Sequence, residues 1–506
     1  MKVSATGPAA DRRSLRYFLA ALLTLLAFPL AGAADTAGVD PWVEEQFRSK
    51  DQVEFILRLK MRADLTDLRD LANALDRRTL IVDRLRQTAE QSQTQLLARL
   101  EQLGVEYRPF WIANAVWVKA DRAVFEELRQ RADIAYIHAN PQVRMELPQA
   151  APAAGEGPDP IEWNIRLIGA PDVWAQGFTG QGAVVGGQDT GYEWDHPALI
   201  DQYRGWNGST ADHNYNWHDS IHTGGGSCGA DSAFPCDDNN HGTHTMGTMV
   251  GDDGGDNQIG VAPGAEWISC RNMDQGNGTP ATYIECFEWF VAPTDLNGQN
   301  ADPSKAPHVI NNSWSCPPEE GCNDVNIMLD TVSNTLDAGI LVVVSAGNSG
   351  PGCSTVSTPA AIYELSFAVG STTIDDTVSS FSSRGPVMVD GSNRLKPDIS
   401  APGSNVRSSI RGGGYASFNG TSMAGPHVAG LAALMISRDP GLAGDPSTLK
   451  SRMKLNAVQL TTTQDCGDVP GSSIPNNTFG YGRIDATASV FQIPEEYFDQ
   501  GFENTP

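Results

Sequence analysis

The first third of the chain alternates between strand-like and helix-like distributions of apolar residues. The run "VEFILRLK" at residues 53–60 predicts a strand, and leucines recurring over residues 80–103, closed by Gly104, predict an amphipathic helix. "VEYRPFWIANAVWVKA" then predicts paired strands, "DRAVFEELRQRA" a second helix and "IAYIHANPQV" a last strand. This β-α-β-β-α-β order predicts a small ferredoxin-like α+β sandwich over about residues 40–146.

A different pattern begins after "LPQAAPAAGEGPDP" (residues 147–160), a linker rich in Ala, Pro and Gly that is open to cleavage. Short branched apolar runs, "GAVVGGQ", "VINNS" and "ILVVVSAG", alternate with longer helical patterns. Such runs are typical of parallel strands buried on both faces, so we expect an α/β domain. Because sites in open α/β sheets form at the C-terminal ends of strands, the polar residues that end these runs are the candidates for chemistry.

The N-terminus has the layout of a secretory signal peptide. Arg12, Arg13 and Arg16 precede the apolar run "YFLAALLTLLAFPLA", and the small residues "AGA" follow, which predicts cleavage after Ala33. A membrane anchor would need a longer apolar span. We therefore expect residues 1–33 to be removed and the protein to be secreted, extracellular or periplasmic in transit, without a membrane partner.

Acidic charge is concentrated in the second part of the chain. Residues 1–150 carry 21 Lys/Arg and 20 Asp/Glu, residues 151–506 carry 14 and 41, and the whole chain has a net charge of −26. Since such a body repels phosphates at long range, we do not expect nucleic acid as a partner.

All eight cysteines lie after residue 227. An even number behind a signal peptide favours disulfides, and no CxxC pair with zinc spacing supports the alternative of a metal site. Cys228 with Cys236, and Cys316 with Cys322, are close enough in sequence to close short loops. We predict these two pairs and leave the remaining connectivity open.

Four polar residues in four separate motifs could carry chemistry, although each has a structural alternative. Asp189 in "VVGGQDTGYEWDHPAL" could orient a histidine or simply form a turn. His241 in "NNHGTHTMGTMV" is placed as a proton carrier at a helix start, while a metal pair with His244 lacks the zinc-protease pattern. Asn348 in "ILVVVSAGNSG" could donate to an oxyanion or favour a turn. Ser422 in "NGTSMAGPHVAG" lies at a predicted helix N-terminus, which would stabilise an oxyanion, but it could equally cap the helix.

The order of these motifs decides between the alternatives. Aspartate, histidine, asparagine and serine, in "DTGYEWDHPAL", "HGTHTMGT", "SAGNSG" and "GTSMAGPHVAG", resemble the subtilase family of serine endopeptidases over about residues 160–490. A lipase or esterase is disfavoured because the G-x-S-x-G elbow is absent. A catalytically inactive subtilase that acts as a binding module is disfavoured because all four positions are present.

The resemblance implies a three-layer α/β fold with a mostly parallel sheet at residues 151–493, and hydrolysis of protein or peptide substrates through an acyl-enzyme. It implies Ser422 as the nucleophile, His241 as general base and then acid, Asp189 as the residue that orients His241, and Asn348 as an oxyanion donor. Residues 34–150 resemble the family's propeptide, an intramolecular inhibitor cut between about residues 146 and 161. Residues 494–506 form an acidic tail, and we expect a monomer.

The resemblance also implies a specificity pocket. It would be flanked by Ser313-Trp314-Ser315 and Ser345-Ala346-Gly347, with Ser357 at its base, where the absence of an acidic residue disfavours a strict preference for basic side chains. No cofactor is required for the chemistry. Structural calcium is compatible with the family, but the acidic loop "GDDGGDNQIG" departs from the familiar asparagine-bearing calcium loop, so no calcium ligands are assigned.

Overall fold

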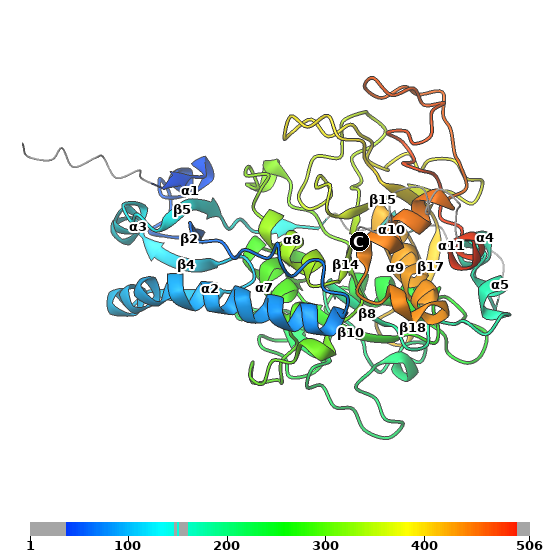
Figure 1. Cartoon of the computed structure of the whole chain (residues 1–506), viewed down its shortest axis with the longest axis horizontal. Helices are drawn as coiled ribbons and strands as arrows, with labels where there is room; N and C mark the ends of the chain where they lie inside the picture. The colour runs from blue at the N-terminus through cyan, green and yellow to red at the C-terminus, as the bar shows by residue number, and fades with distance from the viewer. Residues whose placement is uncertain (1–36, 146–148, 151–159, 493–506) are drawn as a thin grey trace, which may run out of the picture. The chain divides into compact units, whose positions relative to one another are not determined.

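The computed structural model describes residues 37–145, 149–150 and 160–492 (Figure 1). The predicted signal peptide and the acidic C-terminal tail lie outside these residues. Within them, no helix combines the length and the apolar character needed to cross a membrane.

Residues 37–145 form a five-stranded sheet in the order β1-β5-β2-β4-β3 with helices packed against it. The predicted β-α-β-β-α-β order is present as β2, α2, β3, β4, α3 and β5, and only the additional edge pair β1–β5 is parallel. Their bounds are β1 Gly38–Val39, α1 Pro41–Gln46, β2 Gln52–Leu59, α2 Ala74–Leu103, β3 Glu106–Phe110, β4 Ala115–Asp121, α3 Arg122–Arg129 and β5 Ile134–Ala139.

Helix α2 begins six residues before the predicted start. Asn73 caps it, because its side-chain oxygen accepts the backbone N–H groups of Leu75 and Asp76 at 3.0 and 3.1 Å. Leu80, where the apolar pattern begins, is itself 45% exposed. The predicted C-terminal end is correct, since Gly104 takes the left-handed conformation (φ 67°) that commonly ends helices.

The second part of the chain is built on a seven-stranded sheet in which every neighbouring pair is parallel. The strand order is β16-β15-β14-β13-β8-β10-β9. The three runs predicted as strands form β8, β13 and β14. They are adjacent in the sheet, with β13 in the middle. The bounds are β8 Val184–Asp189, β9 Trp217–Asp219, β10 Glu266–Arg271, β13 Val309–Asn312, β14 Leu341–Ser345, β15 Phe367–Thr372 and β16 Ile399–Pro402.

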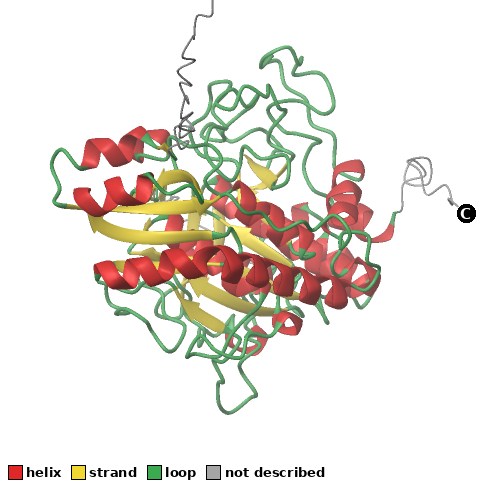
Figure 2. Ribbon diagram, turned by 60° about the vertical axis from the view of Figure 1, so that its left-hand side comes forward, coloured by secondary structure: helices red, strands yellow, loops and turns green. Residues whose placement is uncertain are grey.

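Helices cover both faces of this sheet, which gives the predicted three-layer α/β fold (Figures 1 and 2). Helices α6 (His241–Val250) and α9 (Thr421–Arg438) pack with Val343 in one buried cluster. Helices α7 (Pro280–Val291) and α8 (Leu329–Asp337) pack with Val342 and Val344 in another. Successive residues of β14 thus point to opposite faces, as the pleat of a strand requires. The remaining elements are β6 Val143–Arg144, β7 Gln149–Ala150, α4 Trp163–Leu167, α5 Ala170–Trp174, β11 Met273–Asp274, β12 Asn277–Gly278, β17 Val406–Ile410, β18 Gly414–Asn419, α10 Pro446–Leu455 and α11 Ala486–Phe491, with short 3₁₀ turns between them.

Glycines allow α9 to approach its neighbours closely. A Cβ at Gly430 would lie 2.6 Å from the Cβ of Val261 and 3.0 Å from the carbonyl oxygen of Met249. A Cβ at Gly425 would lie 2.8 Å from the side-chain oxygen of Asn311. The position of the helix relative to α6 and the sheet therefore depends on the absence of side chains at these two places.

The eight cysteines form four disulfides. Both predicted pairs are present, Cys228–Cys236 and Cys316–Cys322. The connectivity left open is Cys270–Cys286, which joins β10 to α7, and Cys353–Cys466, which links positions 113 residues apart.

The N-terminal sheet packs against α7 and α8 through specific polar contacts. A single carboxylate oxygen of Glu288 on α7 accepts the backbone N–H groups of Trp111 and Ile112 at 2.6 and 2.9 Å. Arg108 pairs with Glu285 on the same helix at 2.9 Å. Buried Arg78 on α2 donates to the carbonyl oxygen of Ala338, just after α8, at 2.8 Å. These contacts make residues 37–145 a closely fitted cover of one helical layer.

Candidate active site

The polar residues singled out in the sequence converge on one edge of the parallel sheet. Asp189 is the last residue of β8, and Asn348 follows β14 by three residues. His241 is the first residue of α6 and Ser422 the second residue of α9. Since all strands of the sheet run in the same direction, the ends of β8 and β14 and the starts of these two helices meet at the carboxyl edge.

Asp189 and His241 form a buried pair. The Nδ1 atom of His241 lies 2.7 and 2.9 Å from the two carboxylate oxygens of Asp189, and both side chains are buried. The backbone N–H of Thr190 donates to the same carboxylate at 2.7 Å. The carboxylate therefore fixes both the orientation and the tautomer of the imidazole, so that Nε2 carries the free lone pair. Within the described part of the chain, Nε2 has no hydrogen-bond partner.

The start of α6 is fixed by Asp237, a residue that the sequence analysis missed. Its carboxylate accepts the backbone N–H groups of Asn239, Asn240 and Thr243 at 2.8, 3.1 and 3.1 Å. It also accepts the hydroxyls of Thr190 and Thr243 at 2.9 and 2.6 Å. An aspartate that precedes a predicted helix start by a few residues was the available signal, because such residues cap free N–H groups.

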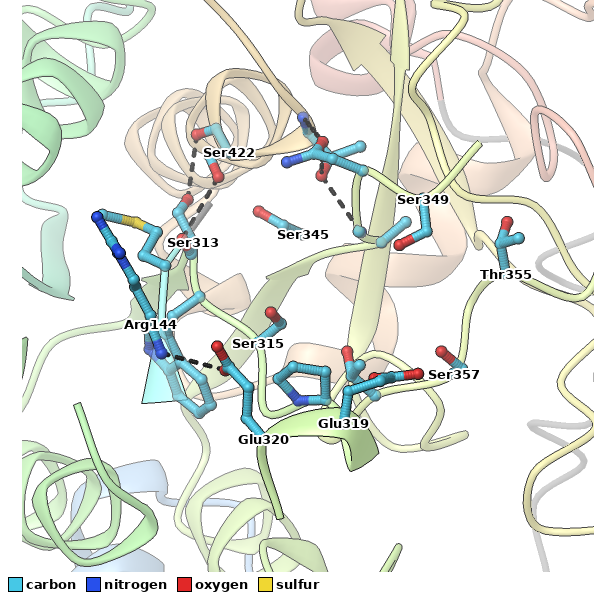
Figure 3. Close-up of a pocket in the computed structure, with 18 of the residues that line it drawn as sticks. Arg144, Ser313, Ser315, Glu319, Glu320, Ser345, Ser349, Thr355, Ser357 and Ser422 are labelled. Atoms are coloured by element: carbon cyan, nitrogen blue, oxygen red, sulfur yellow. Dashed lines mark hydrogen bonds between the residues drawn. The ribbon is translucent and has the colours of Figure 1, made fainter. Parts of the chain in front are cut away.

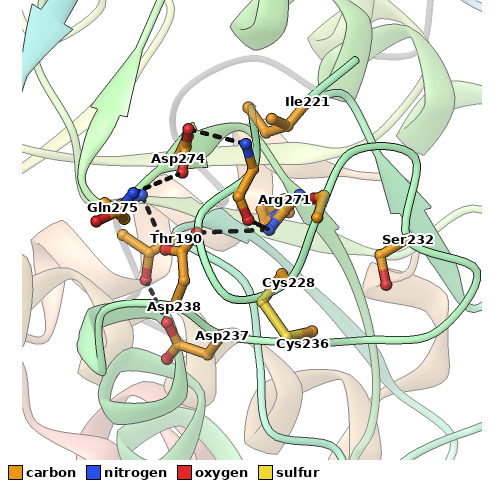
Figure 4. Close-up of polar contacts among 12 residues, drawn as sticks. Thr190, Ile221, Cys228, Ser232, Cys236, Asp237, Asp238, Arg271, Asp274 and Gln275 are labelled. Atoms are coloured by element: carbon orange, nitrogen blue, oxygen red, sulfur yellow. Dashed lines mark hydrogen bonds and ion pairs between the residues drawn. A yellow bond between two sulfur atoms is a disulfide. The ribbon is translucent and has the colours of Figure 1, made fainter. Parts of the chain in front are cut away.

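The loop before α6 is tied to the sheet by Arg271, the last residue of β10 (Figure 4). The fully buried guanidinium donates to both carboxylate oxygens of Asp219 at 3.0 and 2.9 Å and lies 3.5 Å from Asp238. The Cys228–Cys236 disulfide closes the same loop. Burial raises the pKa of Asp238 to about 7, although the N–H of Gln275 and the charge of Arg271 oppose this rise. The segment that carries His241 thus rests on a rigid polar support.

Ser422 lies at the N-terminus of α9 with its hydroxyl turned toward β13. Its Oγ donates to the carbonyl oxygen of Ser313 at 3.3 Å, and the hydroxyl of Ser313 donates to the carbonyl oxygen of Ser422 at 3.1 Å. The free N–H groups and the dipole of the eighteen-residue helix α9 favour negative charge beside Ser422.

Asn348 is held by Thr421, the residue before Ser422. The side-chain oxygen of Asn348 accepts both the backbone N–H and the hydroxyl of Thr421 at 2.9 Å. Because the oxygen of the amide is occupied in this way, its NH₂ group is the end left for a ligand, and it lies on the side of Gly420. Thr421 is a second positioning residue that the sequence analysis did not identify.

A cavity of about 500 Å³ opens beside Ser422 (Figure 3). Its lining is rich in hydroxyl groups, and the Oγ of Ser345 is buried without a hydrogen-bond partner among the described residues. Two carboxylates that the sequence analysis did not place there, Glu319 and Glu320, also line it and come from the loop closed by the Cys316–Cys322 disulfide. The lining includes every residue predicted for the pocket: Ser313, Trp314, Ser315, Ser345, Ala346, Gly347 and Ser357.

The other two histidines near these motifs pack inside the protein. His244 stacks on Phe418 with ring centroids 4.4 Å apart, and His427 lies in α9 with its Nε2 2.8 Å from the amide nitrogen of Asn164. Burial lowers the pKa of His244 to about 3 and that of His427 to about 4. Both are therefore neutral at ordinary pH and do not compete with His241 as a base.

The segment before the predicted cleavage region runs into this cavity. Strand β6 pairs antiparallel with β12, and the N–H of Met145 donates to the carbonyl oxygen of Gly276 at 2.8 Å. Strand β7 pairs antiparallel with β18, which leads directly into α9. Arg144 and Met145 line the same cavity as Ser422. The segment just before residues 146–148 thus reaches the cavity of Ser422, and the segment just after them pairs with the strand that precedes α9.

In the acidic loop at residues 251–260, the side chains of Asp253 and Asn257 already have partners within the protein. The carboxylate of Asp253 accepts N–H groups of Gly255 and Asn257 at 2.9 and 3.1 Å. The side-chain oxygen of Asn257 is taken by Arg407 at 2.6 Å, so a guanidinium cation already lies against this loop. Across the described ranges, no three His, Cys, Asp or Glu side chains gather in a way that could hold a metal ion.

Comparison with known proteins places this geometry in a family. The family model described as the Subtilase family matches residues 180–482. Bacillopeptidase F of Bacillus subtilis (strain 168) is 33% identical over 491 residues, which is 90% of this chain but 32% of that relative, so the chain spans about a third of its length. Subtilisin E of the same strain is 30% identical over 363 residues, 71% of the chain and 80% of the relative. Subtilisin Savinase of Lederbergia lenta is 31% identical over 331 residues, 65% of the chain and 98% of the relative. With the matched region enclosing the buried aspartate–histidine pair and the serine at the helix start, the chain belongs to the subtilase family of serine endopeptidases.

Proposed function

We propose that the protein is a secreted endopeptidase that hydrolyses peptide bonds of protein substrates through an acyl-enzyme, and that it is made as a self-processing zymogen. The observation that carries the catalytic part is the arrangement at one sheet edge. A carboxylate orients a buried histidine, a serine begins a helix, and an asparagine amide is pinned beside that serine. We propose that it acts as a monomer.

In the proposed mechanism, the Oγ of Ser422 leaves the carbonyl of Ser313 and attacks the substrate carbonyl carbon, while Nε2 of His241 accepts its proton. Asp189 stabilises the resulting imidazolium. The Nδ2–H of Asn348 and the backbone N–H of Ser422 donate to the oxyanion. His241 then protonates the leaving amine, and a water molecule activated by the same histidine hydrolyses the ester.

The proposed zymogen consists of a propeptide at residues 34–150 and a peptidase domain at residues 151–493, after a signal peptide at residues 1–33. Support comes from Arg144 and Met145, which line the cavity beside Ser422, and from β7, which pairs with β18, the strand just before α9. Extended backbone added to the edge of a site is a common mode of peptide binding. We therefore propose that the first bond cut lies between residues 146 and 149, within the predicted range of about residues 146–161.

Labelling with a fluorophosphonate tests the catalytic proposal. We expect the processed protein to be labelled and Ser422→Ala to remain unlabelled and uncut. Ser437→Ala is a matched control, because this serine lies in the same helix with its hydroxyl bonded to the carbonyl oxygen of Leu434, and it should be labelled normally. The proposal would be contradicted if Ser422→Ala were labelled as strongly as the parent protein. It would also be contradicted if neither the parent protein nor Ser437→Ala were labelled.

N-terminal sequencing of the processed protein and digestion of casein complete the test. A new N-terminus at one of residues 147–149 supports self-processing, whereas one upstream of residue 140 would contradict it. Casein should be cut and a lipid ester should not, since preferential cleavage of the ester would favour a lipase instead.

A further inference from the structure

We propose that the loop at residues 316–322 is a substrate clamp, in which the Glu320 carboxylate binds a backbone N–H of the substrate and the Cys316–Cys322 disulfide binds an apolar side chain one residue earlier. This inference deepens the proposed function and rests on it, because residues 143–145 are taken as the model of a bound substrate. They are the described part of the chain that runs into the cavity beside Ser422.

The loop is small and closed at its base. The disulfide joins residues only six apart in sequence, and a 3₁₀ turn spans Pro318–Glu320 inside it. The N–H groups of Gly321 and Cys322 donate to the carbonyl oxygens of Pro318 and Pro317 at 3.0 and 3.3 Å. A closed turn of this kind holds its side chains with little conformational freedom to lose on binding. Glu320 is therefore presented at a defined place on the cavity wall.

The first contact of the clamp is a hydrogen bond to the main chain. The backbone N–H of Arg144 donates to a carboxylate oxygen of Glu320 at 3.1 Å (Figure 3). On the opposite edge of the same segment, β6 pairs with β12. The extended segment is thus held from both edges, by a neutral strand on one side and by a charged acceptor on the other. A hydrogen bond to a charged group is about twice as strong as one between neutral groups.

The second contact is apolar. Val143 is 1% exposed and forms a small buried cluster with Cys316 and Cys322. The segment therefore contacts the loop at two points, through the side chain of Val143 and through the backbone N–H of Arg144. These two contacts together fix its position on the loop. The clamp should accept substrates with a small apolar residue at the position of Val143, and it should reject proline at the position of Arg144, since proline has no N–H.

A peptide that copies residues 141–152, "PQVRMELPQAAP", tests the hydrogen bond. A second peptide carries an ester in place of the amide at Arg144, which removes the N–H without adding bulk. With the unaltered enzyme, we expect kcat/KM for the ester peptide to be about tenfold lower. Glu320→Ala should lower kcat/KM for the amide peptide by a similar factor and should leave almost no further difference between the two peptides.

Glu364→Gln is the matched control for loss of one charge, because this residue is 73% exposed, pairs with Arg394 and lies outside the cavity lining. It should behave as the unaltered enzyme does. A peptide with aspartate in place of Val143 should be cut about tenfold more slowly, and one with isoleucine at a near-normal rate. Glu320→Gln provides an acceptor of the same shape and should recover part of the loss.

Several outcomes would overturn the inference. An equal penalty for the ester peptide with unaltered enzyme and Glu320→Ala would exclude the hydrogen bond, and an unchanged rate for the aspartate peptide would exclude the apolar contact. If a variant does not fold, the unaltered enzyme still provides a test, because equal rates for the ester and amide peptides would also exclude the hydrogen bond. An enzyme that is labelled at Ser422 and cuts casein but not the amide peptide would overturn the clamp alone. Failure of both labelling and casein cleavage would instead overturn the proposed function.

Discussion

The proposed oxyanion site depends on one asparagine, Asn348, whose orientation is set by its neighbour Thr421. Thr421 occupies the side-chain oxygen of Asn348, which leaves the amide hydrogens for a developing oxyanion. We expect Asn348→Leu to lower kcat by about 10²- to 10³-fold with little change in KM, because the lost donor acts mainly in the transition state. Steady-state kinetics on a peptide substrate measures this split. A change confined to KM would show that Asn348 binds the ground state instead.

Single residues of the site were predictable only as a set. Asp189, Asn348 and Ser422 each had a structural explanation as a turn or a cap, and only their order favoured catalysis. The two positioning residues, Asp237 and Thr421, carry ordinary capping chemistry in the sequence. Their importance arises from contacts across the fold, such as the bond between Thr421 and Asn348, residues 73 apart in sequence. Contacts between residues so far apart in sequence cannot be predicted from a local sequence pattern.

Among the elements, α9 carries Ser422, so its placement affects the site directly. A methyl group at Gly430 would meet Val261 at 2.6 Å and would force the helix that carries Ser422 away from its neighbours. We expect Gly430→Ala to lower the free energy of unfolding by about 1–3 kcal/mol, the usual cost of overpacking. Urea denaturation of the Ser422→Ala background avoids self-digestion during the measurement.

Gly255→Ala serves as the control for this change. Its Cβ would come no closer than 3.4 Å to the side chain of Asp253, so the free energy of unfolding should stay within about 0.5 kcal/mol of the parent protein. Similar losses in both variants would indicate a general effect of replacing glycine rather than helix packing.

The pattern of apolar residues predicted long elements better than short ones. The central strands β8, β13 and β14 are buried on both faces, so each begins with consecutive apolar residues and lacks a polar–apolar alternation. The start of α2 was missed because a polar cap, not an apolar residue, decides it. Strands β6, β7 and β12 have two residues each and exist only because a partner lies alongside them. No periodicity can be read from two residues.

In the whole molecule, docking of the N-terminal sheet buries an ionisable group. Burial raises the pKa of Glu288 to about 8, while the N–H groups of Ile112 and Trp111 act in the opposite direction. After release of the segment, the carboxyl group returns to water, where its pKa is about 4.3. The docked form therefore binds the proton more tightly. Docking is strongest below about pH 4.3 and loses up to about 1.4 kcal/mol per pH unit as the pH rises toward 8.

We expect a cleaved N-terminal segment to co-elute with the peptidase on gel filtration at pH 5 and to separate from it at pH 8. Glu288→Gln keeps the shape and an acceptor oxygen but does not titrate, so its elution should depend much less on pH. The same dependence in this variant would assign the effect to other groups at the interface, such as Glu285 with its histidine partners.

The resemblance predicted an inhibitory N-terminal segment but not how it docks. Contacts such as that between Trp111 and Glu288 join residues 177 positions apart, and neither residue belongs to a recognisable motif. The disulfide connectivity shows the same limit. The two short loops were predictable from spacing, whereas Cys353–Cys466 required the fold to bring the partners together.

The segment that runs into the cavity belongs to the same molecule as Ser422, and this has a kinetic consequence for the proposed self-cleavage. The first cut is a first-order process whose rate is independent of protein concentration. Before it, the tethered segment is present at an effective concentration in the millimolar range. Afterwards the freed segment is an ordinary ligand whose occupancy falls on dilution. A concentrated sample should stay inhibited long after cutting, whereas a dilute one should become active.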